Sequence, residues 1–496
     1  MEYFLTAVEH LLSFQALFIV LAGTMVGVVV GALPGLGSVI GITLCIPFTF
    51  TMDHVQAITL LVGVYAGSTY GGSISAILIN TPGTPQAAAT CMDGFPLALK
   101  GKAEEAIGWS TFASVFGGTI SCFILLLAAP QLAALAMKFG PVETFALILM
   151  GMTCIATVSQ GDMFKGVLAA CIGLFLGCIG ADPLSGDLRF TWDIFVLSGG
   201  IDIIPVLVGI FALSEVLARI DILARNNVTN IIRCTGLKMP GLKDLKTRWS
   251  VLFKSSIIGS FVGIMPGVGG APAAFISYGE AKRTSPRKAS FGEGEPDGIL
   301  APESANNAVT GGALVPTLAL GLPGDAATAV MLATLMIHGV TPGVRLMVDS
   351  PDIVYAIFLV LFLCNFCLIP TGMLVTKFFS WMLRLHEAIF LPMVVIICIL
   401  GTYGVRNSYF DLVVALIAGG LGIVLRYFKI SPAPLVIGLV LGPQLEISLR
   451  QSILVTRGNI ESMFIGHPIA LVLYLMTILL LAWPFVQSYR EKSKAH

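Results

Sequence analysis

The chain has 496 residues, of which 56% are hydrophobic and 11% are charged, and its mean hydropathy is +0.92. A soluble domain carries about 25% charged residues, so this composition excludes an ordinary water-soluble enzyme. Lys and Arg number 28, as do Asp and Glu, which excludes the strongly basic surface that nucleic-acid binding needs. The sequence therefore predicts an all-α polytopic membrane protein that lies in a lipid bilayer.

Apolar segments along the chain predict the helices in order. A helix needs about 20 apolar residues to span a bilayer. The predicted segments are 14–33, 36–51, 56–80, 106–136, 142–160, 165–181, 196–218, 251–265, 267–279, 305–322, 325–340, 352–375, 379–400, 409–427, 433–442 and 464–487. Two of the shorter segments meet at Pro266-Gly267, and two short arms around such a break predict a re-entrant hairpin.

A polar, basic stretch divides the chain into two membrane parts. We expect an N-terminal membrane repeat at residues 1–218, a basic linker at 219–249 and a C-terminal membrane repeat at 250–496 that ends in a basic tail. Because cytoplasmic loops of membrane proteins are rich in Lys and Arg, we expect the linker and the tail in the cytoplasm. The first ten residues contain acids and no Lys or Arg, so the N-terminus is expected on the opposite side.

Two stretches share the pattern GxxxGxxPGxG, which indicates an internal duplication. The first runs from Gly27 to Gly37 and the second from Gly259 to Gly269. Further along each half, YGGSISAILINTPG matches TGGALVPTLALGLPG with a one-residue insertion. Lys and Arg flank the second hairpin but not the first, so the hairpins are expected to enter from opposite faces. This pattern predicts two inverted structural repeats with re-entrant hairpins and Pro-Gly-broken helices, as in many secondary transporters.

The four Pro-Gly breaks are the predicted site of the chemistry. Non-helical backbone is tolerated at membrane depth only where it lines a cavity or is buried in protein. The N-terminal end of a broken helix attracts anions, and its C-terminal carbonyl groups coordinate cations. A single break is most simply a proline kink that Ser, Thr or Asn repairs, but the paired set favours one shared binding site near the bilayer midplane.

The side chains at the breaks are small, neutral and hydrogen-bonding, which suits a carboxylate together with a hard cation. No Lys or Arg lies within the breaks, so helix ends, bound Na⁺ or a base from elsewhere would balance an anion. Possible Na⁺ ligands are Asn80, Asn306, Asn307 and Asp325. The predicted substrate- and ion-binding residues are Pro34, Gly35, Gly37, Ser38, Asn80, Thr81, Pro82, Gly83, Thr84, Pro266, Gly267, Gly269, Asn306, Asn307, Pro323, Gly324 and Asp325.

Two acidic residues near the breaks each have two interpretations. Asp325 follows the fourth break, where it binds a cation or carries a proton, or caps the next helix; these roles are compatible. Glu303 precedes Asn306 and belongs either to the site or to a solvated position at the edge of a polar loop.

At these motifs the chain resembles the large membrane subunit of the tripartite tricarboxylate transporters, the TctA family. The resemblance covers nearly the whole chain, and its long motifs are specific. It is carried by GALPGLGSVIG (31–41), YGGSISAILINTPGTPQAAATCMDGFPLALKGKAEEAIG (70–108), GIDIIPVLVGIFALSEVL (200–217), GIMPGVGGAPAAFISYGEAKR (263–283) and APESANNAVTGGALVPTLALGLPGDAATAVMLATLMIHGVTPG (301–343).

The resemblance implies a permease subunit of the bacterial inner membrane that imports tricarboxylates or dicarboxylates by symport with Na⁺ or H⁺. It implies no ATP and no cofactor beyond the coupling ion. It also implies two partners, a small TctB-like membrane subunit and a periplasmic TctC-like solute-binding protein that delivers the substrate. The N-terminus is then periplasmic and the C-terminus cytoplasmic. We expect an elevator-like or rocking movement of the hairpins and broken helices against the longer segments.

Transferred by motif, the family site falls around Pro34, Pro82, Asn306, Asn307 and Pro323. Two residues depart from the family pattern. Asp325 replaces a small residue such as Ser, which puts the choice of ion or the charge of the substrate in question. Val344 replaces a frequent proline, which alters only a loop.

Two other classes of function stay open from the residues alone. Gly324-Asp325 invites comparison with intramembrane aspartyl proteases, but GLPGD is not GxGD, and HExxH, GxSxG and phosphate-loop motifs are absent. We therefore expect no enzyme and no catalytic residue. Inverted breaks would also line a passive anion channel. Cys364 and Cys367 form a CxxC motif inside an apolar run, where packing is expected rather than a metal centre.

Overall fold

The chain folds almost entirely into helices. Its computed structural model describes residues 8–9, 11, 13–158, 163–182, 184–223, 232, 234, 236–343, 346–382 and 387–494. Within these ranges the strands form one short antiparallel pair, β1 (Gly180–Ala181) with β2 (Leu188–Arg189). Six of the described helices are long and apolar enough to cross a membrane, which confirms the expected all-α multi-pass membrane protein. The expected positions of the N-terminus, of linker residues 224–231 and of Val344 lie outside the described residues.

The helices follow one another in two similar series. The first series is α2 (Phe14–Ala32), α3 (Gly37–Thr49), α4 (His54–Ile79), η1 (Pro85–Ala88), α5 (Cys91–Leu97), η2 (Ala98–Lys102), α6 (Ala103–Ala136), α7 (Pro141–Val158), α8 (Met163–Gly177), η3 (Phe195–Gly199), α9 (Ile203–Leu207), η4 (Val208–Leu213) and α10 (Ser214–Leu223). The second is α11 (Leu242–Lys246), α12 (Trp249–Ile264), α13 (Gly270–Thr284), η5 (Lys288–Ser290), α14 (Asp297–Leu320), α15 (Ala326–Ile337), α16 (Leu346–Asp349), α17 (Pro351–Met382), α18 (Glu387–Arg406), α19 (Tyr409–Tyr427), α20 (Ala433–Val455), α21 (Ile460–Ile465) and α22 (Pro468–Lys494).

One helix extends well past the apolar segment that predicted it. α20 continues to Val455, whereas hydropathy ended the segment at residue 442. In the extension, Arg450 forms a 2.9 Å ion pair with Asp182, which follows β1. Because this partner comes from a distant part of the sequence, the polar extension is stable in the fold although its composition is not apolar.

The same backbone turn joins α2 to α3 and α12 to α13. The first turn has a left-handed backbone at Gly35 (φ 83°) and Gly37 (φ 64°), and the second at Gly267 (φ 82°) and Gly269 (φ 71°). Glycine adopts these angles without the steric cost that a Cβ brings. The repeated PGxG pattern is therefore the sequence of a tight helix-turn-helix hairpin.

The first hairpin packs along α4 through a stripe of glycines. A Cβ at Gly27 would lie 2.5 Å from the carbonyl oxygen of Val64, and one at Gly31 would lie 2.3 Å from that of Ser68. The residue numbers of the contacting pairs increase along both helices, so α2 and α4 run in the same direction. Small residues let the two backbones approach closely.

The second hairpin packs along α14 in the same manner. A Cβ at Gly259 would lie 2.1 Å from the carbonyl oxygen of Ala305, and one at Gly263 would lie 2.9 Å from that of Val309. α12 and α14 therefore also run in the same direction. Each hairpin is thus tied to the long buried helix that follows it in the chain.

The long helices α4 and α14 run in opposite directions. The hydroxyl pairs Tyr70–Thr111 and Ser73–Ser110, each 2.7 Å apart, join α4 to α6 in an antiparallel arrangement. α6 and α14 run in the same direction, because they touch first at Gly117 with Ser304 and further along at Ser121 with Gly311. The two hairpins, each parallel to its own long helix, consequently point in opposite directions.

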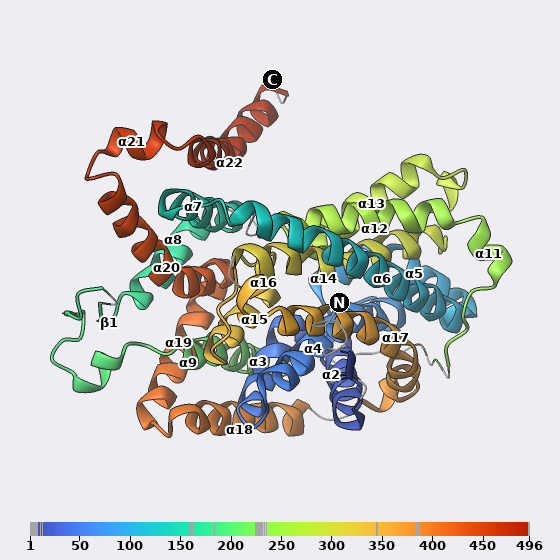
Figure 1. Cartoon of the computed structure of the whole chain (residues 1–496). Helices are drawn as coiled ribbons and strands as arrows, with labels where there is room; N and C mark the ends of the chain where they lie inside the picture. The colour runs from blue at the N-terminus through green and yellow to red at the C-terminus, as the bar shows by residue number, and fades with distance from the viewer. Residues whose placement is uncertain are drawn as a thin grey trace.

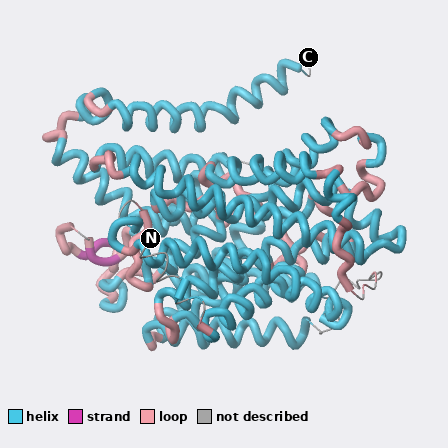
Figure 2. Tube along the Cα trace, turned by 45° about the vertical axis from the view of Figure 1, so that its right-hand side comes forward, coloured by secondary structure: helices cyan, strands magenta, loops and turns pink. Residues whose placement is uncertain are grey.

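One long helix from each half of the chain packs against helices of the other half. α17 packs against α2 and α4, while α6 packs against α12 and α14, and these helices form the middle of the bundle (Figure 1). The C-terminal helix α22 lies along the outer edge of the bundle (Figure 2), where it contacts α7. The two sequence halves are therefore interleaved around one core.

Candidate functional site

A cavity of about 1100 Å³ lies beside the second hairpin turn. Its wall includes Gly267 and Gly269 of that turn, Asp325 at the start of α15, Gln86 of η1, and Ile40 of α3. η1 directly follows the second Pro-Gly break, and Asp325 directly follows the fourth. Of the described residues at the four predicted breaks, Gly267 lines the cavity, whereas Gln86 and Asp325 lie just after the second and fourth breaks and Ile40 belongs to the first hairpin.

A backbone hydrogen bond joins the two breaks of the second half. The backbone N–H of Gly267 donates to the carbonyl oxygen of Gly324 at 2.8 Å. A Cβ at Gly324 would lie 2.5 Å from the Cα of Ala313, so the chain after Pro323 folds back tightly along α14. This return path sets the first turn of α15 next to the hairpin turn that contains Pro266.

The break in the first half folds back in a similar way. The backbone N–H of Gly83 donates to the carbonyl oxygen of Gly72 at 3.2 Å. A Cβ at Gly83 would lie 1.9 Å from the carbonyl oxygen of Gly31, next to the end of α2. Pro82 and Gly83 thereby carry the chain from the end of α4 back to the first hairpin and onward to η1.

Asp325 both caps a helix and lines the cavity, so the two roles expected for it coexist structurally. Its Oδ1 accepts hydrogen bonds from the backbone N–H (2.7 Å) and the hydroxyl (2.9 Å) of Thr328. Its Oδ2 accepts a hydrogen bond from the Tyr65 hydroxyl at 2.7 Å. Tyr65 comes from the middle of α4, and an apolar helix gave no sequence signal that would single it out.

Asn306 lies directly behind the cavity wall. Its amide nitrogen donates to the carbonyl oxygen of Thr69 at 3.1 Å, but its Oδ1 has no hydrogen-bond partner among the described residues. A Cβ at Gly270 would lie 2.8 Å from this oxygen and 2.6 Å from Cγ of Gln86. The Oε1 of Gln86 likewise lacks a partner within the described part of the chain, and sequence reasoning missed this residue.

Two buried hydroxyl groups at the breaks of the first half are also unsatisfied. Ser38 and Thr84 are 6% and 1% exposed, and neither hydroxyl oxygen is hydrogen-bonded within the ranges that the structure describes. Buried polar atoms are hydrogen-bonded in the large majority of cases. Like Asn306 Oδ1 and Gln86 Oε1, these hydroxyl oxygens are buried without a hydrogen-bond partner among the described residues.

Other predicted site residues lie away from the cavity wall. Asn80 and Thr81 are exposed at the end of α4, where Asn80 adopts a left-handed backbone (φ 53°). The amide nitrogen of Asn307 donates hydrogen bonds to Ser114 Oγ at 2.8 Å and to the carbonyl oxygen of Glu303 at 3.1 Å. Pro34 and Gly35 form the first hairpin turn and do not line the cavity.

Glu303 is fully buried, so the expectation of a solvated position is wrong. Its carboxylate accepts hydrogen bonds from the Thr90 hydroxyl and, at 3.3 Å, from the Ser114 hydroxyl. These donors come from the segment before α5 and from α6. The polar loop ends before Asp297, and Glu303 lies in the second turn of α14, whereas the sequence analysis began this helix at residue 305.

Basic residues also line the cavity. Lys165 of α8, Arg426 of α19 and Lys429 after α19 line the cavity together with Glu215 of α10. Arg426 forms an ion pair with Glu215, and Lys165 donates to the carbonyl oxygen of Phe428 at 2.8 Å. These bases come from elements that are far from the four breaks in the sequence. In the sequence, these basic residues could have been singled out because they lie in or next to apolar segments, where an ionisable side chain is usually functional.

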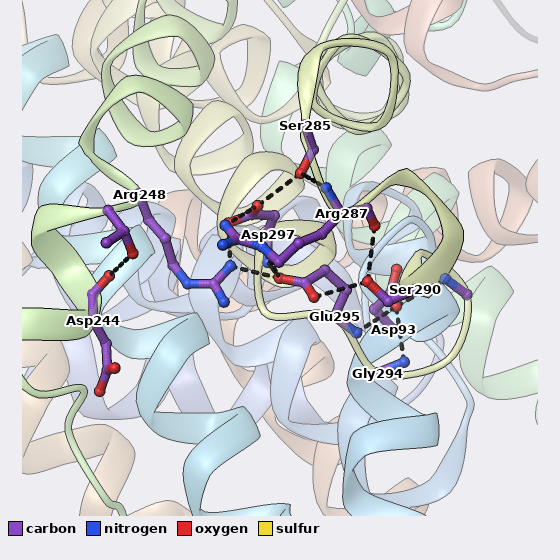
Figure 3. A network of polar contacts seen from close by, with 11 residues as sticks. Asp93, Asp244, Arg248, Ser285, Arg287, Ser290, Gly294, Glu295 and Asp297 are labelled. Atoms are coloured by element: carbon purple, nitrogen blue, oxygen red, sulfur yellow. Dashed lines mark hydrogen bonds and ion pairs between the residues drawn. The ribbon is translucent and has the colours of Figure 1, made fainter.

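A separate polar cluster joins the two halves at the start of α14 (Figure 3). Asp93 of α5 accepts backbone N–H bonds from Gly292, Gly294 and Glu295 at 2.9, 2.9 and 2.8 Å. The same carboxylate accepts a hydrogen bond from the Tyr278 hydroxyl of α13 at 2.8 Å. The cluster therefore fixes α5 of the first half to the second hairpin.

Two arginines complete this cluster. Arg248 forms a 2.6 Å ion pair with Glu295 and also pairs with Asp297, and its guanidinium lies 5.4 Å from the ring centroid of Trp109. Arg287 pairs with Asp297 at 2.7 Å. Every member has a partner here, so this cluster is a structural joint, in contrast to the unsatisfied oxygens near the cavity.

A helical multi-pass fold with a cavity beside a helix break is the arrangement of many membrane transport proteins. Comparison with known proteins gives the family. The chain belongs to the tripartite tricarboxylate transporter TctA family, whose sequence model matches residues 17–437. It is accordingly a transport protein and not an enzyme, which removes the intramembrane protease from consideration.

Two bacterial proteins are similar in sequence to this chain. An uncharacterized 52.8 kDa protein of the TAR-I ttuC' 3' region of Agrobacterium vitis is 33% identical over 473 residues, which cover 95% of this chain and 94% of that protein. An uncharacterized protein of the TAR-II ttuC' 3' region of the same organism is 33% identical over 237 residues, 47% of this chain and 98% of the relative. No solved structure matches the chain.

Proposed function

We propose that this chain is the large permease subunit of a carboxylate importer in the bacterial inner membrane, driven by symport of Na⁺ or H⁺. A small TctB-like membrane subunit and a periplasmic TctC-like solute-binding protein complete the system. Membership of the TctA family supports the transport role and the tripartite assembly. The observation that carries the site is the cavity beside the second hairpin turn, whose wall includes Gln86 and Asp325 and behind which Asn306 Oδ1 has no hydrogen-bond partner among the described residues.

The two halves act as inverted repeats in this proposal. The opposite directions of α4 and α14, and of the hairpins parallel to them, support inversion. The basic linker is cytoplasmic by the positive-inside rule, so the first hairpin enters from the periplasm and the second from the cytoplasm. The N-terminus is periplasmic, the C-terminus is cytoplasmic, and the hairpin turns lie near the bilayer midplane.

The coupling cation binds among the unsatisfied oxygens behind the second hairpin turn. Amide oxygens accept hydrogen bonds and cannot donate them, so Asn306 Oδ1 and Gln86 Oε1 suit a hard cation such as Na⁺. The hydroxyl groups of Ser38 and Thr84 are further oxygen ligands of the same kind. The substrate carboxylate binds toward Lys165, Arg426 and Lys429, whose positive charge attracts it into the cavity.

Transport follows from movement of one wall of the cavity against the other. The lining of the cavity includes the second hairpin turn and the starts of α13 and α15, together with residues of α8, α10, α19 and the start of α20. An elevator-like displacement of the first group exposes the cavity to each side of the membrane in turn. Binding of both cation and carboxylate favours the movement because it satisfies the oxygens that are otherwise unpaired.

Reconstitution tests this proposal. The full chain is placed in proteoliposomes with the small subunit, the binding protein is added outside, and uptake of a panel of labelled carboxylates is measured with and without an inward Na⁺ or H⁺ gradient. We expect gradient-dependent accumulation and counterflow, in which unlabelled internal substrate accelerates entry of label. Carboxylate flux without accumulation or counterflow would identify a passive channel, and no carboxylate flux at all would contradict the proposed function.

A further inference from the structure

Glu303 of α14 is a buried acid that the proposed transport step does not use. Its side chain is 0% exposed, and no charged group of the described residues faces its carboxyl group. The other titratable groups that face it there are the Tyr70 hydroxyl of α4 and the Cys91 thiol of α5, which are uncharged at neutral pH. Because an ionised carboxylate is costly to bury without a cation, the protonated form of Glu303 is favoured here.

The hydroxyl groups around Glu303 suit both of its protonation states. A hydroxyl either donates or accepts a hydrogen bond. The ionised carboxylate accepts from the hydroxyls of Thr90 and Ser114, whereas the protonated form donates to Thr90 Oγ1 and still accepts from Ser114. The amide nitrogen of Asn307 donates to Ser114 Oγ at 2.8 Å, which leaves the Ser114 proton for Glu303. Loss of one proton therefore needs no rearrangement of these side chains.

The same two segments form the proposed cation site, one turn away. Asn306 follows Glu303 by three positions on α14, and residues at this spacing have Cβ atoms about 5–6 Å apart. Gln86 precedes Thr90 by four positions in the segment that contains η1. A Cβ at Gly270 would lie 2.8 Å from Asn306 Oδ1 and 2.6 Å from Cγ of Gln86. The two segments thus come together at the cation site and again at Glu303, where Thr90 makes its hydrogen bond.

A cation at this site lacks a compensating charge on its oxygen ligands. The Oδ1 of Asn306 and the Oε1 of Gln86 are neutral and have no hydrogen-bond partner within the described ranges. In a buried environment, the attraction between a cation and a carboxylate one turn away is much stronger than in water. Bound Na⁺ therefore favours the ionised form of Glu303, and a proton on Glu303 weakens Na⁺ binding to the same extent.

On the basis of the proposed function, we propose that Glu303 carries a proton that is released when Na⁺ binds at Asn306 Oδ1 and Gln86 Oε1. The O–H bond of the carboxyl group breaks, its electron pair stays on the carboxylate, and the proton passes to water. Na⁺ and the proton thus exchange at neighbouring sites without a net gain of buried charge. Acid opposes Na⁺ binding, because it keeps Glu303 protonated.

Proton release on addition of Na⁺ tests this linkage directly. The detergent-purified full chain is titrated with NaCl at constant ionic strength, with choline in place of Na⁺ at the start. A pH indicator in weakly buffered solution measures released protons, and thermal stabilisation measures Na⁺ binding between about pH 6 and pH 9. We expect release of roughly half to one proton per chain, and a Na⁺ affinity that rises by up to about tenfold per pH unit until Glu303 is ionised.

Two substitutions separate this role from a structural one. Glu303→Gln keeps the shape and the hydrogen bonds of the protonated acid but cannot ionise, so Na⁺ is expected to bind more weakly, without proton release and without pH dependence. Glu143→Gln is the matched control, because Glu143 is also buried (7% exposed) but pairs with His467 at 2.8 Å. This control is expected to release protons as the wild type does.

The outcomes distinguish this inference from the proposed function. Na⁺ binding to the wild type without proton release would overturn the linkage even if Glu303→Gln fails to fold, and so would equal release from Glu303→Gln and the wild type. Absence of Na⁺ binding at every pH would also overturn it, while H⁺-driven import would stand. The proposed function itself fails only if the reconstituted wild-type system moves none of the labelled carboxylates.

Discussion

Adjacent residues of the same type have different environments at the candidate site. Asn307 donates through its amide nitrogen to Ser114 and to the Glu303 carbonyl, which ties α14 to α6. Asn306, one position earlier, keeps an unsatisfied Oδ1 next to the second hairpin turn. Asn80, the third predicted amide, is exposed at the end of α4. Only Asn306 among them combines burial with a free acceptor oxygen next to the cavity wall.

Substitution of Asn306 is expected to weaken cation coupling. Asn306→Ala removes one oxygen ligand, and we expect the Na⁺ concentration for half-maximal carboxylate uptake to rise roughly tenfold, which corresponds to about 1.4 kcal/mol. Initial uptake rates in proteoliposomes over a range of Na⁺ concentrations measure this value. Asn80→Ala is the matched control and is expected to leave the Na⁺ dependence unchanged; an unchanged dependence in Asn306→Ala would remove Asn306 from the ion site.

At the scale of elements, the hairpins depend on close contact between helix backbones. Gly27 of α2 faces the carbonyl oxygen of Val64, and no side chain fits between them. Gly420 of α19, in contrast, has open space where its Cβ would lie. Both glycines lie inside long apolar helices, so their sequence surroundings are similar while their packing is not.

The same substitution at these two glycines is expected to have opposite effects. Gly27→Ala forces α2 away from α4 and should destabilise the fold by about 1–3 kcal/mol. Gly420→Ala should be neutral or stabilising by up to about 1 kcal/mol, because alanine favours a helix over glycine. Thermal unfolding of the detergent-solubilised variants compares them. Equal melting temperatures would mean that the hairpin accommodates a side chain at Gly27.

The segment after β1 is expected to respond to acid. The pKa of Asp182 is lowered to about 2 by hydrogen bonds from the backbone N–H of Leu184 and Ser185 and by the nearby Arg450 and Arg189. Because the folded pKa lies below the ordinary value of about 3.9, this carboxylate stabilises the segment above pH 4, and the contribution is lost as pH falls from 4 toward 2.

Protease susceptibility of this segment measures the effect. Cleavage between β1 and β2 by an acid-stable protease is expected to increase as the pH is lowered from 4 to 2. Asp182→Asn should be cleaved at pH 5 nearly as fast as the wild type at low pH, with little further change on acidification. A wild-type cleavage rate that is the same at both pH values would contradict this role for Asp182.

The sequence predicted the elements better than the contacts between them. The PGxG turns were predictable because Gly35 and Gly267 need a left-handed backbone that few other residues adopt. The cap by Asp325 was predictable for a similar local reason. Tyr65 and Gln86 were not, since their roles arise only when α4, η1 and the second hairpin meet, and the bases Lys165 and Arg426 come from helices far from the breaks in sequence.

At the scale of the whole molecule, the two halves are interleaved. α6 packs on the second hairpin and α17 on the first, so each predicted repeat completes the core of the other. This arrangement constrains how the chain crosses the membrane, because α4 and α14 must keep opposite directions while they share neighbours. We expect the basic linker to set the orientation of the bundle, because cytoplasmic loops are rich in Lys and Arg.

Reporter fusions test that orientation. Alkaline phosphatase, which is active only outside the cytoplasm, is inserted after Gly186 between β1 and β2, or after Gly241 in the linker. We expect activity at Gly186 and none at Gly241, since α9, η4 and α10 lie between them and the basic linker stays inside. A cytoplasmic fluorescent reporter should give the complementary pattern. Activity at both positions would contradict the proposed topology.

The hydrogen bonds made by Asp93 have a consequence for cleavage of the chain. This carboxylate belongs to α5 in the first half of the chain but accepts hydrogen bonds from three N–H groups of the loop that precedes α14, so the two halves are joined by these contacts as well as by the linker. Two polypeptides produced by cleavage in the linker would therefore stay associated as one particle.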